Sequence, residues 1–230
     1  MSNKPPRPDI LLATTNKSKV TPFKKEWEKY GFHNKYSLIT LIDLGLKDLV
    51  HIDEDTGTFD GDALKKALAY CTQYKLPTIS LDRGIEFESL NNWPGTLTKE
   101  ILAGDNDRIL GLKKREHSRY KQDIERTKKL LDLLKDKNRL VYSLYGIAFV
   151  LPNGKLIKKQ IKIKGTASDT VRITDNGYFY DWFFIPDGQK RTLSEMGKEE
   201  YLEYTSSILW PFPISVQNFI DQNLSVDDIV

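Results

Sequence analysis

The sequence predicts an α/β fold, because apolar, β-branched runs alternate with segments of helical periodicity. The clearest run is Thr78–Leu81, which ends in the carboxylate of Asp82 and is followed by Arg83 and Gly84. Such a run is typical of a buried strand, and ligands of open α/β sheets bind outside the carboxyl ends of strands. Gly84 would let the chain turn there. Asp82 is therefore a candidate for chemistry, although a carboxylate that only caps a turn is the commoner case.

The chain begins with an expected strand over residues 9–13, and a polar segment then leads into a helix. Apolar residues that recur at helical spacing mark the buried face of this helix, and a glycine ends the pattern: Val20, Phe23, Trp27, Tyr30 and Gly31. Asn16 suits the N-cap position. Backbone N–H groups and Lys19 at this helix start favour an anion, but an ordinary cap with a solvated lysine explains the same residues.

Acidic residues follow the second expected strand region, which covers residues 37–51 with its core at 38–42. Asp53, Glu54 and Asp55 lie next to one another, and neighbouring carboxylates repel unless a cation or solvent screens them. Oxygen-rich clusters of this kind suit Mg²⁺, while a plain solvated loop is more common. A helix is expected from about residue 62 to residue 74.

The second half of the chain contains further strands and a basic segment. Residues 85–90 alternate as a half-exposed strand does, residues 91–95 form a turn, and residues 139–164 form a long β-hairpin. Residues 105–129 are strongly basic. A solvated helix face or an insertion explains them better than a nucleic-acid site, because Tyr120 is the only aromatic residue among them.

Residues 178–185 are rich in aromatic side chains and carry Asp181 at their centre. One interpretation is a core strand with a single surface carboxylate. The other is a stacking platform whose carboxylate hydrogen-bonds a nucleotide base. Two helices, near residues 198–208 and 214–222, complete the predicted elements.

Composition limits the classes of function. A chain of 230 residues suits one large domain or two small lobes, and a net charge of +3 argues against a dedicated nucleic-acid binder. Cys71 is the only cysteine, so nothing requires an oxidising compartment. No apolar run resembles a signal peptide or spans a membrane, so we expect a cytoplasmic protein without a membrane partner.

Six motifs, in order along the chain, resemble the inosine triphosphate pyrophosphatase family, which hydrolyses non-canonical purine nucleoside triphosphates. The residues that match are Thr14, Asn16 and Lys19; Asp55–Gly57 with Asp62–Ala67; Asp82 and Gly84; Pro94 and Gly95; Tyr178–Trp182; and Pro186–Gly188 with Thr192–Met196. Each motif is weak alone, but six in sequence over nearly the whole chain are specific.

The chain also departs from the family pattern. Leu81 replaces the first acid of an Asp-Asp pair, and Tyr201-Leu202 replaces a Lys-Asn pair. Thr205–Ser207 replaces a Ser-His-Arg motif that reads the six-keto purine. The residues expected to contact the triphosphate are therefore retained, whereas the residues expected to recognise the base are replaced. From the loss of fixed donors we expect no strong preference for inosine or xanthosine triphosphate.

The resemblance implies a single domain over residues 1–230 with a basic insertion at about 105–122. Its fold would be a long, mixed, twisted sheet with flanking helices, in two lobes around a central cleft. The implied activity is Mg²⁺-dependent hydrolysis of a nucleoside triphosphate to monophosphate and pyrophosphate, and the family is commonly homodimeric. The alternatives are a catalytically silent nucleotide-binding protein, which Leu81 favours, or a hydrolase of another nucleotide.

The resemblance also assigns roles to residues. Asp82 would be catalytic and would hold the metal together with Asp55 or Glu54. The residues expected to bind the substrate are Thr14, Asn16, Lys19, Lys66 and Lys99 toward the phosphates, and Tyr178, Tyr180 and Asp181 toward the base.

Overall fold

The structure is a computed structural model that describes residues 7–45, 50–98, 101, 119–174, 179–209 and 211–223. The chain divides into two compact units. Unit 1 comprises Met1–Asp82, Gly146–Gln160 and Tyr204–Val230, and unit 2 comprises Arg83–Tyr145 and Ile161–Glu203. Three long strands, β3 (Thr78–Phe87), β5 (Leu140–Val150) and β6 (Leu156–Ala167), each continue from one unit into the other.

The strands form a mixed sheet with the hydrogen-bonded order β2-β1-β3-β5-β6-β7, and β4 pairs with β3. The short strands are β1 (Asp9–Leu12), β2 (Ser37–Thr40), β4 (Trp93–Gly95) and β7 (Phe184–Pro186). β1 pairs in parallel with β2 and with β3, whereas the β3–β4 and β6–β7 pairs are antiparallel. The predicted α/β class with a mixed sheet and flanking helices is thereby confirmed. The cleft between two lobes stays a prediction.

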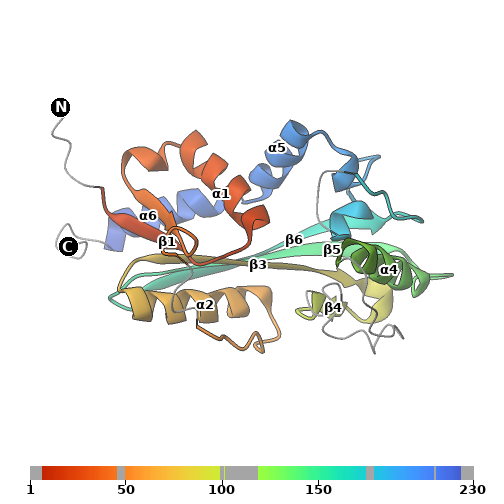
Figure 1. The fold of residues 1–230 in the computed structure, drawn as a ribbon, viewed down its shortest axis with the longest axis horizontal. Coiled ribbons are helices and arrows are strands. Elements are labelled where there is room, and N and C mark those ends of the chain that lie inside the picture. Colours follow the sequence, from red (N-terminus) through yellow and green to blue (C-terminus); the bar gives the residue numbers. More distant parts are fainter. Residues whose placement is uncertain are drawn as a thin grey trace. The chain divides into compact units, whose positions relative to one another are not determined.

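In unit 1, helices α1 (Lys17–Lys29) and α2 (Phe59–Tyr74) lie on opposite sides of the strands (Figure 1). α1 begins directly after Asn16, as the sequence predicts. α2 begins three residues before the predicted start at residue 62, because the Thr58 hydroxyl accepts from the Gly61 N–H at 3.2 Å and caps it. α2 packs on the sheet through small residues, with a cluster formed by Ala63, Ala67, Cys71, Ala148 and Val150.

The prediction that the chain turns at Gly84 is wrong. β3 continues without interruption to Phe87, so only residues 85–87 of the strand expected at 85–90 are strand, as the end of β3. Residues 88–90 form a 3-10 helix instead. Ile85 is fully buried, and burial of this side chain favours continued pairing over a turn. Asp82 consequently lies inside a strand, but three residues beyond Ile79, where the register with β1 ends.

The predicted strand region at residues 37–51 is also too long, because β2 ends at Thr40. A side-chain turn stops it. The Asp43 carboxylate accepts from the Thr40 N–H at 2.9 Å and from the Thr40 hydroxyl at 2.7 Å, and the Leu44 N–H donates to the Thr40 carbonyl at 3.1 Å. Aspartate commonly closes turns in this way.

In unit 2, the interpretation of residues 178–185 as one strand centred on Asp181 is wrong. The described part forms a 3-10 helix, η3 (Phe179–Trp182), followed by β7. The Phe183 N–H donates to the Tyr180 carbonyl at 3.2 Å, and this bond folds the chain back. Asp181 therefore points into unit 2, where it is fully buried.

The turn expected at residues 91–95 is confined to residues 91–92, because Trp93–Gly95 form β4 and pair with β3. The other elements agree with the sequence to within a few residues. The β5–β6 hairpin is confirmed, and its turn carries Gly154 at a φ of 84°. The other helices are η1 (Phe32–Asn34), η2 (Glu88–Leu90), α4 (Arg119–Asp132), η4 (Leu193–Glu195), α5 (Lys198–Leu209) and α6 (Pro211–Asn223). Among the described residues, no helix combines the length and apolar character needed to span a membrane.

Candidate active site

Two lysines and two carboxylates meet in unit 1 and form what we call the lysine–carboxylate cluster: Lys19, Glu54, Lys66 and Asp82. The Asp82 carboxylate lies 3.1 Å from the Lys19 ammonium and 3.5 Å from the Lys66 ammonium. Lys66 also contacts the Glu54 carboxylate at 2.6 Å. The four side chains are between 11% and 18% exposed, so the charges are shielded but reachable. The cluster thus combines anion-binding and cation-binding groups at one place.

The fold explains why these residues meet. Lys19 lies in the first turn of α1, and Lys66 lies on α2 on the other side of the strands (Figure 1). β1 ends before it can pair with the central part of β3, so side chains from both helices reach Asp82. The Lys19 ammonium also donates to the Leu81 carbonyl at 3.0 Å, which fixes it against β3.

The charges of the cluster stabilise one another. Burial works against the ammonium form of Lys66, but the carboxylates of Asp82 and Glu54 outweigh burial and raise its pKa. Asp82 in turn has two positive neighbours, Lys19 and Lys66. A bound polyanion could replace the carboxylates as the partner of the two ammonium groups. Both carboxylates would then be available to bind a cation.

The carboxylates fit a Mg²⁺ ion that is shared with a substrate. Glu54 and Asp82 contact the same ammonium group, so they lie close enough to hold one cation between them. Within the described residues, no group of three or more histidine, cysteine or acidic side chains could hold a metal alone. Protein Mg²⁺ sites are often built from one or two carboxylates and substrate phosphates, which is what the cluster offers.

The structure separates the two alternatives for the first metal ligand. Asp55 points to the exposed side of α2, where it pairs with Lys65, and this hydrogen bond lowers the pKa of Asp55. Glu54, not Asp55, is brought together with Asp82. Thr14 and Asn16 lie before α1, and the Asn16 N–H donates to the Thr14 hydroxyl at 3.2 Å. These two residues therefore shape the turn that presents Lys19.

A second polar group lies in unit 2 and is called the Arg83 cluster: Arg83, Tyr145, Tyr180, Asp181 and Tyr201. The Arg83 guanidinium lies 5.2 Å from the centre of the Tyr180 ring, which is itself buried. The Tyr201 hydroxyl donates to the Asp181 carboxylate at 2.9 Å. Burial raises the pKa of Tyr145, Tyr180 and Tyr201 above the ordinary value of tyrosine, so these hydroxyls are uncharged well beyond neutral pH.

In the Arg83 cluster, one of the predicted base-stacking rings is already in contact with another side chain. Tyr180 and Asp181 do lie side by side, as the sequence suggests, but the face of Tyr180 carries a guanidinium. Arg83 and Tyr201 were not identified as site residues, because a strand arginine and a helix tyrosine carry no motif of their own. The predicted residues Lys99 and Tyr178, and most of the basic segment at 105–122, lie outside the described residues.

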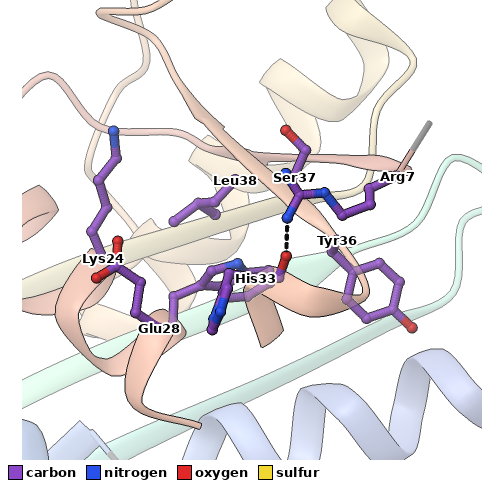
Figure 2. A pocket seen from close by; sticks show the side chains of 8 residues that line it. Arg7, Lys24, Glu28, His33, Tyr36, Ser37 and Leu38 are labelled. Carbon is purple, nitrogen blue, oxygen red and sulfur yellow. Dashed lines mark hydrogen bonds between the residues drawn. The ribbon is translucent and has the colours of Figure 1, made fainter. Parts of the chain in front are cut away.

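A surface pocket of about 240 Å³ lies elsewhere in unit 1, beside α1, η1 and β2 (Figure 2). Its lining consists of Arg7, Lys24, Trp27, Glu28, His33, Tyr36, Ser37 and Leu38. The Arg7 guanidinium donates to the His33 carbonyl across it. None of the predicted site residues lines this pocket, so the pocket is not evidence for the candidate active site.

Comparisons with known proteins point to one family. A family model described as the Ham1 family matches residues 10–205. A dITP/XTP pyrophosphatase of Deinococcus deserti is 31% identical over 198 residues, covering 83% of this chain and 80% of that protein. One of Aquifex aeolicus is 27% identical over 191 residues, covering 83% and 87%. The fold is shared with the Ham1 protein of Staphylococcus aureus, at a TM-score of 0.69 and 21% identity, covering 91% and 98%.

Proposed function

Because this chain belongs to the Ham1 family, we propose that it is a hydrolase that splits a nucleoside triphosphate into a monophosphate and pyrophosphate. Family membership agrees with the resemblance to inosine triphosphate pyrophosphatases that the sequence predicts. The observation that carries the proposal is the lysine–carboxylate cluster, in which two ammonium groups and two carboxylates share contacts of 2.6–3.5 Å. Such a set can hold a triphosphate and its divalent cation together.

The residues of the cluster have complementary roles in this proposal. Lys19 and Lys66 bind the phosphate tail, because an ammonium group is a compact charge suited to several phosphate oxygens. Glu54 and Asp82 would hold Mg²⁺, which when bound neutralises charge on the phosphates. Asp82 orients a water molecule and accepts its proton as the water oxygen attacks the α-phosphorus. The bond from that phosphorus to the bridging oxygen breaks, and pyrophosphate leaves.

Leu81 does not weaken this proposal. Its side chain is buried, and the contribution of residue 81 to the cluster is its backbone carbonyl, which accepts from Lys19. The cluster keeps both groups that hydrolysis requires, cations for the phosphates and carboxylates for the metal.

The test is pyrophosphate release from a panel of nucleoside triphosphates, with and without Mg²⁺, by the wild type and by Asp82→Asn. We expect the substitution to lower kcat by about 10²-fold or more, because it removes a metal ligand and a proton acceptor. Asp187→Asn is the matched control, since its carboxylate is exposed and only approaches Lys164 at 3.8 Å.

The outcomes separate the parts of the proposal. If the wild type releases no pyrophosphate from any nucleotide, the proposed activity is wrong. If the wild type is active and Asp82→Asn retains near-normal turnover, the activity stands and the role of Asp82 is wrong. Activity that survives removal of all divalent cations would contradict the role of Mg²⁺.

We further propose that the protein is a homodimer in the cytoplasm. The dimer is supported by the family resemblance alone. The cytoplasm is supported by the single cysteine, Cys71, which is buried and reduced. Light scattering in solution tests the first statement, and localisation of the tagged protein tests the second.

A further inference from the structure

The surface pocket of unit 1, beside α1, is lined by elements that are packed against one another (Figure 2). Trp27 belongs to the lining and is buried, and its ring centre lies 5.1 Å from that of Phe32. The Ser37 N–H donates to the Pro8 carbonyl at 2.9 Å, so the segment that carries Arg7 is tied to the start of β2. The walls of the pocket are therefore set by the fold and are in place before a ligand arrives.

Opposite charges line the two sides of this pocket. Arg7 reaches it from the segment before β1, and Glu28 reaches it from α1. Figure 2 shows the Arg7 guanidinium on one side and the Glu28 carboxylate on the other, with the His33 ring between them. A small molecule in the pocket would therefore meet a cation at one end and an anion at the other.

These two charges are not neutralised by other side chains. Lys24, which also lines the pocket, pairs with Asp43 at 3.6 Å. Among the residues that the structure describes, Arg7 donates to a backbone carbonyl and has no carboxylate partner, and the Glu28 carboxylate has no ion-pair partner. A guanidinium only donates hydrogen bonds, and a carboxylate only accepts them. The strongest partners for this pair are a carboxylate for Arg7 and an ammonium group for Glu28.

The size and the remaining lining of the pocket limit the ligand further. Trp27 and Leu38 supply apolar surface. The volume of about 240 Å³ lies below the range of about 300–1,000 Å³ that is usual for drug-sized ligands. A nucleotide would be large for this volume and would bring its phosphates toward the carboxylate of Glu28. A compact molecule with one charge of each sign matches the pocket better.

We propose that this pocket binds a free α-amino acid with an apolar side chain. The α-carboxylate accepts hydrogen bonds from the Arg7 guanidinium, and the α-ammonium group donates to the Glu28 carboxylate. The apolar side chain of the ligand lies against Leu38 and Trp27, where it leaves water. This site is separate from the lysine–carboxylate cluster, and the inference does not depend on the proposed function.

The experiment compares a zwitterion with its two singly charged analogues. Calorimetry on the full chain measures the binding of L-leucine, of 3-methylbutylamine, which lacks the carboxylate, and of 4-methylpentanoate, which lacks the ammonium group. We expect L-leucine to bind with a Kd of about 1 mM or tighter. Each analogue should bind about 10-fold more weakly or less, because it has lost one charge-assisted hydrogen bond.

Two substitutions identify which charge meets which group of the ligand. Arg7→Gln should weaken L-leucine about 10-fold and leave 3-methylbutylamine unchanged, whereas Glu28→Gln should weaken L-leucine about 10-fold and not weaken 4-methylpentanoate. Both side chains are exposed, so neither substitution should disturb folding. Arg191→Gln and Glu203→Gln are the matched controls, because they change exposed residues of unit 2 and should leave all three affinities as in the wild type.

Three results would overturn the inference. The first is a wild type that does not bind L-leucine at about 10 mM. The second is binding of 4-methylpentanoate or inorganic phosphate as tight as that of L-leucine, which would make the pocket a simple anion site. The third is unchanged binding of L-leucine in both Arg7→Gln and Glu28→Gln, which would place the ligand elsewhere. Pyrophosphate release is not measured in this experiment, so each of these results leaves the proposed function intact.

Discussion

Replacing Gly146 by alanine should test how the start of α2 is held in place. Gly146 lies on β5, and a Cβ atom there would be 2.0 Å from the carbonyl carbon of Phe59 and 2.3 Å from the backbone nitrogen of Asp60. Both atoms belong to backbone, so no side-chain rotation relieves the clash. Carbon atoms pack at about 3.5–4.0 Å, so α2 and β5 would have to separate by about 1.5 Å.

The surrounding contacts resist that movement. The Phe59 N–H donates to the Gln160 side chain at 3.2 Å, and Asp60 pairs with Lys158 at 2.8 Å. Phe59 is itself buried. We expect Gly146→Ala to lower the free energy of unfolding by about 3 kcal/mol, the upper end of the usual overpacking range, because backbone must yield. For a chain of this length that corresponds to a fall in Tm of about 6–12 °C.

The same movement of α2 should also change the geometry of the lysine–carboxylate cluster. Lys66 lies two helical turns after Phe59 on the same helix, so a shift of α2 moves its ammonium relative to Asp82. A displacement of about 1 Å can cost 10²-fold in rate. Thermal unfolding and pyrophosphate release on the same preparation measure both effects.

Gly197→Ala is the matched control for this substitution. Gly197 has no atom within 4 Å of a Cβ position, and its φ is not left-handed. Gly197 precedes α5 and its carbonyl accepts from the Tyr201 N–H at 2.8 Å, so it is the N-cap of that helix, where alanine is less favourable than glycine. We therefore expect that variant to lose no more than about 1 kcal/mol of stability, clearly less than Gly146→Ala. If Gly146→Ala instead unfolds within about 2 °C of the wild type and retains its rate, the tight contact between β5 and α2 does not exist in solution.

Two other predictions follow from the same structure. Lys19→Ala and Lys66→Ala should each weaken binding of a triphosphate by about 10-fold or more while leaving binding of the nucleoside unchanged, as calorimetry can show; equal losses for both ligands would remove these lysines from the phosphate site. The Thr192 N–H and hydroxyl stabilise the Glu195 carboxylate and lower its pKa below 4.5 in the folded protein. That stabilisation is present above the unfolded pKa of 4.5 and is lost as the pH falls through the folded pKa. Glu195→Gln should therefore lose less stability than the wild type on acidification below about pH 5, and parallel curves for the two proteins would contradict this account.

The sequence by itself determined the elements that local patterns encode. Helical spacing of apolar residues identified α1, and the alternation around Pro152–Gly154 identified the β5–β6 hairpin. The order of six motifs identified the family, and with it Lys19, Lys66 and Asp82 as residues that belong together. These features depend on neighbours in the chain, so a pattern of residue types is sufficient to reveal them.

Only the tertiary structure decided which groups face one another. Strand β3 runs through Gly84 because burial of Ile85 is worth more than a local turn, and no local pattern reports that burial. Glu54 and Asp55 are adjacent in sequence, yet only Glu54 reaches Lys66. Arg83 lies over the ring of Tyr180, which is about a hundred residues away along the chain. Contacts at such separations depend on how the whole chain packs, which a reading of local sequence does not contain.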